Sequence, residues 1–576
     1  MPSDFLRRWS VLILPTRVVG FATACCFSVA SFSQGFDVVF RGGDVMDGAG
    51  SPAFRADVGV VADRIEAIGD LSAAAADRIV DISGKTIIPG IIDLHSHADE
   101  RDASAGLRAK EPKRRAAPNL VSQGVTALVA NQDGRSPLNI LGQRNQLAVR
   151  RFGPNAVLMA GHNSLRRAAM GNDAERPATT DEIHVMAALL RTGMEAGAYG
   201  LSAGLEYEPG RWSETSELEA LVRVVKPYGG VYIVHERASG SDPVWYMPSH
   251  DGPGAPTMLD SIMETIAICE ATGVISVATH IKARGEDYWG QSRAIVNAIE
   301  SARARGVKIF ADQYPYTTSG SDGVFSLLPR WILDETRHLR LGNEKDFGLA
   351  LKHILSDPEK NGALRRDVER QVRRRGGAEH IVVFGHPDPG CVGRSLAAIA
   401  AANEVAPVEM ALRFQFDGYP DRFGGVQLRG FSMSEDDIEY FVAQPWVATA
   451  SDAGITLPTD GLVHARFYGT FPRKIREYAL KRGVLSVEQA VRSMTSLPAE
   501  ILGMSKRGRV AQGHFADLAV IDLSTIRDTT TFLKPHQYAE GIEYVLVNGV
   551  FVVDGGELTW ALPGRVLTPR NSQERN

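Results

Sequence analysis

The chain has 576 residues, of which 44% are hydrophobic and 23% are charged. These proportions are ordinary for a globular protein, and they exclude wholesale disorder and a polytopic membrane protein. The net charge of −5 gives no electrostatic argument for nucleic acid or an anionic membrane as a partner. The four cysteines are too few for a disulfide scaffold, and the sequence leaves open whether Cys269 and Cys391 pair.

The N-terminal segment has the pattern of an export signal. A short basic start precedes an apolar run over residues 18–30, and Ser31 and Ser33 then stand at the −3 and −1 positions of a cleavage site. Basic, apolar and small-residue segments in this order are typical of a secretory signal peptide. We therefore predict a signal peptide over residues 1–33 and a periplasmic or secreted protein. The alternative is a misassigned start upstream of a cytoplasmic protein.

Short predicted strands gather toward both ends of the remaining chain. Residues 36–89 hold β-rich runs separated by turns that contain Gly and Asp, and residues 505–560 repeat this style. Asn548 and Gly549 lie between two apolar runs, which is a strong signal for a β-hairpin. We expect the two segments to build one small β-sandwich domain.

Residues 90–504 alternate short apolar runs with helical patterns. Eight strand–helix units predict an α/β fold, a (β/α)8 TIM-like barrel, with strands at residues 91–94, 126–130, 157–160, 199–203, 231–234, 275–279, 307–311 and 447–450.

A ninth apolar run and an arginine-rich helical stretch do not fit the eight units. They cover residues 381–384 and 346–375, so we expect an insertion at about residues 320–390, between the last two barrel strands. Because Asp and Glu are interspersed with the arginines, the stretch predicts a solvated helix face rather than a nucleic-acid surface.

The predicted strand ends carry residues that bind metals. His95 and His97 follow the first strand, His235 the fifth, His280 the sixth and Asp452 the eighth. Chemistry in this barrel class sits at the C-terminal ends of the strands. Alternate strand residues point to the same side, so His95 and His97 can reach one metal ion. A lone histidine after a strand is usually structural, but four such ends in this order predict a Zn²⁺ site.

The segment 89–97, which reads PGIIDLHSH, resembles the metal-binding opening of the amidohydrolase superfamily. Within that superfamily the chain resembles the N-acyl-D-amino-acid deacylases, or D-aminoacylases. This resemblance covers about residues 36–560 and rests on segments 161–166, 200–207, 312–317, 464–473 and 495–550. It implies a metal-dependent hydrolase that splits the amide bond of N-acyl-D-amino acids into a carboxylate and a free D-amino acid.

One segment departs from the family pattern, which often has a metal-binding or bridging cysteine after the second strand. Here Gln132 or Asp133 takes that place. A carboxylate bridges two cations better than an amide oxygen does, which favours Asp133, although Asp133 could equally serve only to shape an Asp-Gly turn. The number of Zn²⁺ ions, one or two per chain, therefore stays open.

The resemblance and the strand order together suggest roles for the polar residues. His235 and His280 would hold the first metal, and His95, His97 and Asp452 would hold or approach a second. Asp452 would also act as the general base that takes the water proton and passes it to the amide nitrogen.

Four further residues are candidates for binding the substrate carboxylate. Lys282 follows His280 at the spacing that keeps it on the same side, and Arg466 offers a bidentate fork. Tyr314 and Ser319 match the family's substrate-binding stretch, and Ser321 is the alternative to Ser319. The competing interpretation for each is a structural hydrogen bond or a surface ion pair.

Two other functions remain open at this point. A cyclic-amide hydrolase of the hydantoinase or dihydroorotase kind usually has a carboxylated lysine as bridge, and no predicted strand end offers that lysine. A catalytically silent periplasmic metal-binding protein would not need the full histidine set together with Asp452.

We expect a small-molecule substrate, no nucleic acid and no membrane beyond export, and the sequence does not reveal an oligomeric state.

Overall fold

Parallel strands form the centre of the fold, as the alternating pattern predicts. The computed structural model describes residues 35–99, 105–323, 325–337 and 346–569. Within this part of the chain, two parallel sheets have the orders β10-β9-β8 and β11-β12-β13-β14-β15-β18. Their strands are β8 (Ile91–Asp93), β9 (Val125–Ala130), β10 (Asn155–Leu158), β11 (Ala160–Gly161), β12 (Gly200–Gly204), β13 (Val231–His235), β14 (Ile275–Ala278), β15 (Ile309–Gln313) and β18 (Val447–Thr449).

Backbone hydrogen bonds connect the two sheets at both gaps. The Tyr199 N–H donates to the Leu158 carbonyl, which links β10 to the start of β12. The Asp452 N–H donates to the His95 carbonyl, which links the ends of β18 and β8. The predicted eight-unit barrel is thus confirmed, with β10 and β11 together forming its third strand.

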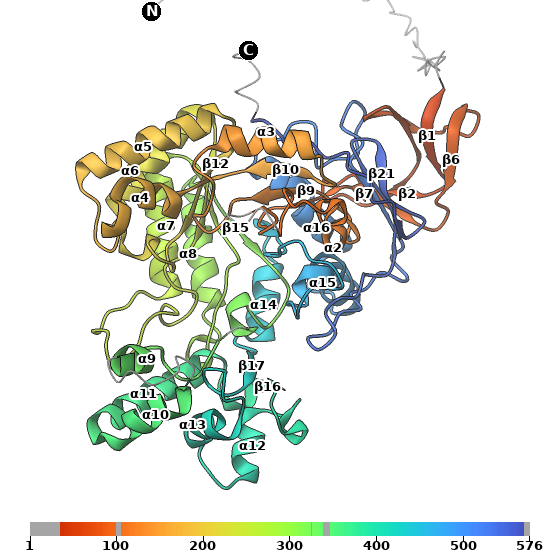
Figure 1. Ribbon diagram of the computed structural model, residues 1–576. Coiled ribbons are helices and arrows are strands. Elements are labelled where there is room, and N and C mark those ends of the chain that lie inside the picture. Colours follow the sequence, from red (N-terminus) through yellow and green to blue (C-terminus); the bar gives the residue numbers. More distant parts are fainter. Residues whose placement is uncertain (1–34, 100–104, 324, 338–345, 570–576) are drawn as a thin grey trace, which may run out of the picture. The chain divides into compact units, whose positions relative to one another are not determined.

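Helices cover the outside of the barrel strands (Figure 1). The strands themselves are almost entirely buried, which explains why they read as continuous apolar runs rather than as alternating ones. Capping boxes fix the starts of three of the helices, at Thr179 with Glu182, at Thr257 with Asp260 and at Ser486 with Gln489. The helices are α3 (Ile140–Arg150), α4 (His162–Met170), α5 (Thr180–Glu195), α6 (Thr215–Val225), α7 (Met258–Thr272), α8 (Ser292–Ala304), α14 (Glu435–Val442) and α16 (Val487–Met494).

Strands from the two ends of the described chain share one sheet, as predicted. Its order is β22-β21-β20-β19-β7-β2-β3, and a second sheet has the order β5-β4-β1-β6. Asn548 and Gly549 form the predicted hairpin turn between β20 and β21, both with positive φ. The strands are β1 (Phe36–Arg41), β2 (Asp44–Val45), β3 (Phe54–Arg55), β4 (Asp57–Val61), β5 (Arg64–Gly69), β6 (Ala76–Asp81), β7 (Thr86–Pro89), β19 (Leu518–Ile521), β20 (Ile542–Val547), β21 (Val550–Asp554) and β22 (Glu557–Leu558).

The insertion between β15 and β18 forms a lobe with its own apolar core (Figure 1). The surplus apolar run is β16 (Ile381–Gly385), which pairs antiparallel with β17 (Gln427–Gly430). The helices of this lobe are α9 (Trp331–Thr336), α10 (Phe347–Ser356), α11 (Pro358–Arg374), α12 (Leu396–Ala402) and α13 (Pro407–Asp417).

The prediction of a solvated arginine-rich helix is wrong for the C-terminal turn of α11. Arg374 is buried in an ion pair with Asp242, and the next residue, Arg375, is buried in an ion pair with Asp322. Asp242 lies in the loop after β13, so Arg374 attaches the insertion lobe to the barrel, whereas Asp322 lies in the segment between β15 and α9.

Three further points concern the export signal, the cysteines and membrane-spanning helices. The predicted signal peptide, residues 1–33, lies outside the described residues. Cys269 and Cys391 are both free thiols and do not pair. In the ranges that the structure describes, we find no helix with the length and apolarity needed to cross a membrane.

Candidate metal centre

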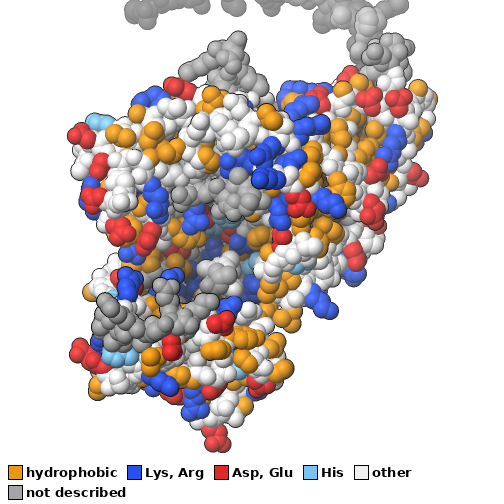
Figure 2. Space-filling view, viewed as in Figure 1, with side chains coloured by type: hydrophobic (Ala, Val, Ile, Leu, Met, Phe, Trp, Pro, Cys, Tyr) orange, Lys and Arg blue, Asp and Glu red, His pale blue; other side chains and the backbone are white. Residues whose placement is uncertain are grey.

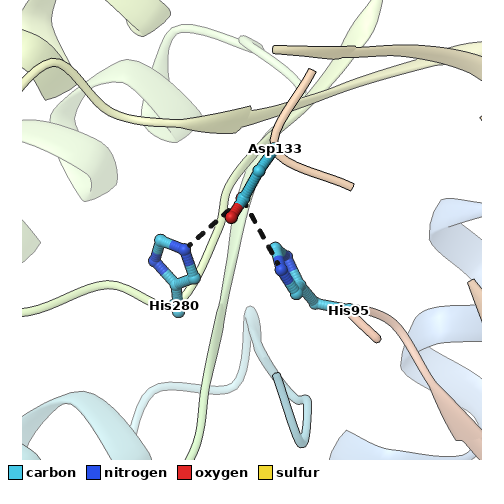
Figure 3. A group of neighbouring side chains, drawn as sticks. All are labelled: His95, Asp133 and His280. Carbon is cyan, nitrogen blue, oxygen red and sulfur yellow. Dashed lines mark ion pairs between the residues drawn. The ribbon is translucent and has the colours of Figure 1, made fainter. Parts of the chain in front are cut away.

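The barrel brings the predicted metal ligands together at the C-terminal ends of its strands. The Asp133 carboxylate lies among the four imidazoles, between His95 and His280 in Figure 3. Its Oδ1 is 3.4 Å from Nδ1 of His235 and 3.7 Å from Nε2 of both His95 and His280. Its Oδ2 is 3.7 Å from Nε2 of His97. One carboxylate therefore faces imidazoles from three different strands.

Asp452 approaches the same cluster from the eighth strand. Its Oδ1 lies 2.9 Å from Nε2 of His97 and 3.6 Å from Nε2 of His95. Two overlapping groups result, each with ligand atoms within 4.8 Å of one another. One contains His95, Asp133 and His280, and the other contains His95, His97 and Asp452.

The backbone is unusual at the residues that supply these ligands. Asp133, His280 and Asp452 have φ values of 55°, 37° and 49°, which non-glycine residues seldom adopt and which cost about 1–3 kcal/mol each. Gly134 follows at φ 73°, and a Cβ there would lie 2.1 Å from Oδ1 of Asn163. The Asp-Gly turn that the sequence suggests is therefore real, and it also places the Asp133 carboxylate in the cluster. The alternative, Gln132, instead donates its side-chain amide to the Leu94 carbonyl.

The cluster contains buried polar atoms that have no hydrogen-bond partner among the described residues. These atoms are Nε2 of His95, Nδ1 of His235 and Oδ1 of Asp133. Buried polar atoms are hydrogen-bonded in the great majority of cases, so three converging exceptions fit a cation that completes their coordination. Imidazole and carboxylate ligands suit Zn²⁺ and neighbouring transition metals.

Burial keeps two of the imidazoles in the form that binds metals. It lowers the pKa of His95 to about 4. Burial and the neighbouring Lys282 ammonium lower the pKa of His280 well below its usual range. Both rings are therefore neutral near pH 7, and a neutral imidazole is the ligating species.

Polar groups behind the imidazoles hold the rings in place. Oε2 of Glu206 lies 3.1 Å from Nε2 of His235, on the ring edge opposite Asp133. Oγ1 of Thr279 lies 2.6 Å from Nδ1 of His95 and donates to Asp312. Such partners orient metal ligands and fix their tautomers.

These supporting residues were not predicted from the sequence. Glu206 belongs to the segment 200–207 that carried the family resemblance and follows a strand end, so its position could have identified it. Asp312 likewise opens the segment 312–317 and directly follows a predicted strand, so the same criterion applies to it. Thr279 lies inside a predicted strand and gave no such signal.

A cavity of about 370 Å³ opens over the cluster. All four predicted substrate-binding residues line it: Lys282, Tyr314, Ser319 and Arg466. It is also lined by Arg135, Glu206, Tyr207, Arg284 and Ser321, which the sequence analysis did not assign to the site, apart from naming Ser321 as an alternative. Figure 2 shows a hollow above the insertion lobe with basic side chains gathered in it.

Several donors on the lining of this cavity lack a hydrogen-bond partner among the described residues, including donors of Arg466 and Tyr314. Nε of Arg466 and Oη of Tyr314 are buried and lack hydrogen-bond partners among the described residues. The Arg466 guanidinium lies 4.6 Å from the Tyr314 ring centre, so the two groups are neighbours. A Cβ at Gly320 would lie 2.9 Å from Nη2 of Arg466, so the absence of a side chain there leaves the guanidinium its space.

Arg466 also forms an ion pair with Asp452, with 2.8 Å between Nη1 and Oδ2. Burial opposes ionisation of Asp452, but Arg466 and His97 hold the pKa of its carboxyl well below the usual range. Asp452 is therefore a carboxylate at neutral pH. Lys282 is engaged as well, since its Nζ lies 2.8 Å from both Nδ1 and the carbonyl oxygen of His280.

A parallel α/β barrel with imidazoles and carboxylates converging at its strand ends defines a metal-dependent barrel enzyme. Residues 78–553 match the sequence profile described as the amidohydrolase family, and the chain belongs to this family.

Relatives with known names cover nearly the whole chain. It is 32% identical to a D-aminoacylase of Alcaligenes xylosoxydans xylosoxydans, over 93% of this chain and 98% of the relative. It is also 32% identical to an N-acyl-D-glutamate deacylase of the same organism, over 92% and 96%. A solved N-acyl-D-glutamate deacylase from Bordetella bronchiseptica superposes with a TM-score of 0.69 at 29% identity, over 93% of this chain and 100% of that one. That structure is described as a complex with zinc and a phosphonate that mimics the tetrahedral intermediate.

Proposed function

We propose that this protein is a zinc-dependent deacylase that hydrolyses N-acyl-D-amino acids to a carboxylate and a free D-amino acid. One observation carries the proposal. The cavity has a metal-ligand cluster at its base and, beside it, the unpartnered donors of Arg466 and Tyr314. An N-acyl amino acid carries a free carboxylate next to its scissile amide. The amide can therefore face the metal-ligand cluster while the carboxylate meets the donors of Arg466 and Tyr314. The names of the relatives support this assignment.

Asp133 is the residue we propose as the bridge between two metal sites. Its Oδ1 faces His235 and His280, and its Oδ2 faces His97. His235 and His280 would hold one Zn²⁺ with Oδ1, and His95, His97 and Asp452 would hold a second. When bound, zinc lowers the pKa of a water molecule and polarises the amide carbonyl.

Asp452 serves as the general base in this proposal. Its carboxylate is ionised and lies beside His97, so it can accept the proton of the water that adds to the amide carbon. It then transfers this proton to the amide nitrogen as the carbon–nitrogen bond breaks, which releases a neutral amine. One residue thus handles both proton transfers.

Arg466 and Tyr314 bind the substrate carboxylate, and Ser319 and Lys282 complete that wall of the cavity. A charge-assisted hydrogen bond from a guanidinium is stronger than one between neutral groups and fixes direction. When Arg466 and Tyr314 hold the carboxylate and the amide faces the metal-ligand cluster, the stereocentre between these two groups has a fixed orientation. That geometry would give a preference for D over L substrates.

The test compares matched substrates on the purified zinc-loaded protein. N-acetyl-D-amino acids should be hydrolysed, whereas their L forms and carboxamide-capped D forms should react poorly. Elemental analysis should find one or two zinc ions per chain. Equal cleavage of the capped substrates would contradict carboxylate recognition and indicate a broader amidase. Turnover of hydantoins in place of linear amides would indicate the cyclic-amide alternative.

We also propose that the protein is exported. The basic, apolar and small-residue pattern of residues 1–33 supports this. N-terminal sequencing of the native protein should begin near Gln34, and an intact Met1 on cytoplasmic protein would contradict export.

A further inference from the structure

A second cavity, of about 420 Å³, lies where the barrel meets the sheets built from the chain ends. Tyr199 lines it and directly precedes β12. Glu206, which contacts His235, follows the opposite end of β12. A five-residue strand spans roughly 16 Å. This cavity is therefore at the other end of the barrel from the candidate metal centre.

The lining of this cavity is strongly cationic. Arg64, Lys506, Arg507 and Arg565 all line it, and no carboxylate does among the described residues. Two acids lie behind them. Asp63 forms ion pairs with both Arg64 and Arg565, and Asp517 forms one with Arg507. Four cations against two carboxylates leave an excess of about two positive charges, in a chain whose net charge is −5.

Aromatic contacts hold two of the guanidinium groups in fixed positions. The Cζ atoms of Arg64 and Arg507 lie 3.5 Å and 3.9 Å from the ring centre of Phe515. Planar guanidinium groups stack well on aromatic faces. Arg507 is also buried, and its Nη2 donates to Oδ1 of Asn548. A ligand would therefore meet positive charges that are already ordered, which lowers the entropy cost of binding.

The remaining donors are accessible to a ligand. Lys506 is exposed, and the Arg565 side chain is 51% exposed although one of its nitrogens contacts Asp63. The rest of the lining includes Tyr199 and apolar side chains of the segment 566–567. The cavity thus combines a cationic wall with room for a small organic group.

We propose that this cavity binds a phosphate dianion, either free or as the phosphoryl group of a small monoester. The local excess of two positive charges matches the charge of about −1.5 to −2 that such a group carries at pH 7. Arg and Lys are the residues that recognise phosphate oxygens. Arg64 comes from the sheet β5-β4-β1-β6, and Lys506 and Arg507 follow the barrel helices. The anion would therefore link the sheets to the barrel. This proposal does not depend on the deacylase function.

The experiment titrates the zinc-loaded protein with inorganic phosphate and, separately, with phenyl phosphate, by calorimetry at constant ionic strength set with chloride. The test protein is the double variant Lys506→Gln/Arg565→Gln, which removes two exposed charges. The matched control is Lys352→Gln/Arg305→Gln, which removes one Lys and one acid-paired Arg at exposed positions elsewhere.

We expect saturable binding of at least one probe to the wild type and to the control, at least 10-fold weaker in the test variant. Saturation should also raise the melting temperature of the wild type. Binding of phenyl phosphate alone would identify a monoester as the ligand, whereas binding of both probes would show that free phosphate suffices. Phosphate that binds at the metal centre would bind all three proteins equally. Equal binding by all three, or no saturable binding of either probe to the wild type, would overturn the proposal.

Discussion

Replacing Glu206 with Gln removes a charge behind a metal ligand while keeping the shape of the side chain. In the structure Oε2 of Glu206 lies 3.1 Å from Nε2 of His235, and Oε1 lies 3.2 Å from Nη2 of Arg284. Both partners are buried. The substitution should therefore have two separable effects, one on metal affinity and one on stability.

The size of each effect follows from these contacts. Loss of a partner that orients a metal ligand typically weakens metal binding about 10–100-fold, or roughly 1.4–2.8 kcal/mol. Loss of one member of a buried ion pair costs about 3–5 kcal/mol, because the other charge stays buried without compensation. The Val244 backbone N–H donates to Oε1 and the Ser239 hydroxyl donates to Oε2. The single amide oxygen of Gln can keep one of these hydrogen bonds, so both values are upper estimates.

The two effects require two assays and one further variant. Zinc affinity is measured by competition with a chelator, and the stability of the metal-free protein by urea unfolding. The double variant Glu206→Gln/Arg284→Met should recover most of the stability, because it also removes the uncompensated charge of Arg284. It should retain the weakened zinc affinity. Wild-type zinc affinity in Glu206→Gln, measured on folded protein, would refute the claim that Glu206 orients His235.

Four other substitutions test the remaining assignments. Asp133→Asn should lower the zinc content to one ion or less per chain, since a neutral amide bridges cations poorly; unchanged two-zinc occupancy measured by elemental analysis would remove Asp133 from the bridge. Asp452→Asn should keep the fold and the zinc held by His235 but lower kcat about 10²-fold or more, and near-normal kcat would show that another group takes the proton. Arg466→Lys keeps the charge but loses the planar fork, so KM for acyl-D-amino acids should rise while the poor activity on carboxamide-capped substrates changes little. Lys474 is buried, and burial lowers its pKa from 10.5 to about 7. Between pH 7 and pH 10.5 this lysine is protonated in the unfolded chain but neutral in the folded protein. The free energy of unfolding should therefore rise with pH across this range, by up to roughly 5 kcal/mol. Urea unfolding at pH 7, 8.5 and 10 should show that Lys474→Met removes this rise; an identical pH slope in both proteins would contradict a neutral buried lysine.

The sequence predicts best what periodicity and strand geometry determine. Parallel strands buried on both faces read as apolar runs, and their shared polarity brings His95, His235 and His280 to one end of the barrel. Asp133 could be predicted only as one of two neighbours. The backbone conformation that directs it into the cluster has φ 55°, and an Asp-Gly pair permits but does not require it.

Contacts between distant segments could not be predicted from the sequence. Arg374 looked like a solvated residue because acidic residues surround it along the helix, but its partner Asp242 belongs to a barrel loop. The ion pair between Arg466 and Asp452 joins a predicted substrate ligand to the predicted base. Local pattern carries no information about such pairings, since they depend on how separate loops are placed by the completed barrel.

The shared sheet has a consequence for how the chain is made. β7 pairs with β19, so that Thr86 lies opposite Ile521 and Pro89 opposite Leu518. At about 5–20 residues per second, a ribosome reaches residue 521 roughly 20–90 s after residue 89. During that interval β7 can pair with β2 on one side, while its other edge, flanked by apolar side chains, stays open. Open strand edges promote aggregation, so the nascent chain passes through a stage in which the unpaired edge of β7 is a site for aggregation. A chain truncated before β19 would stay in that stage permanently, although every barrel strand would already be present.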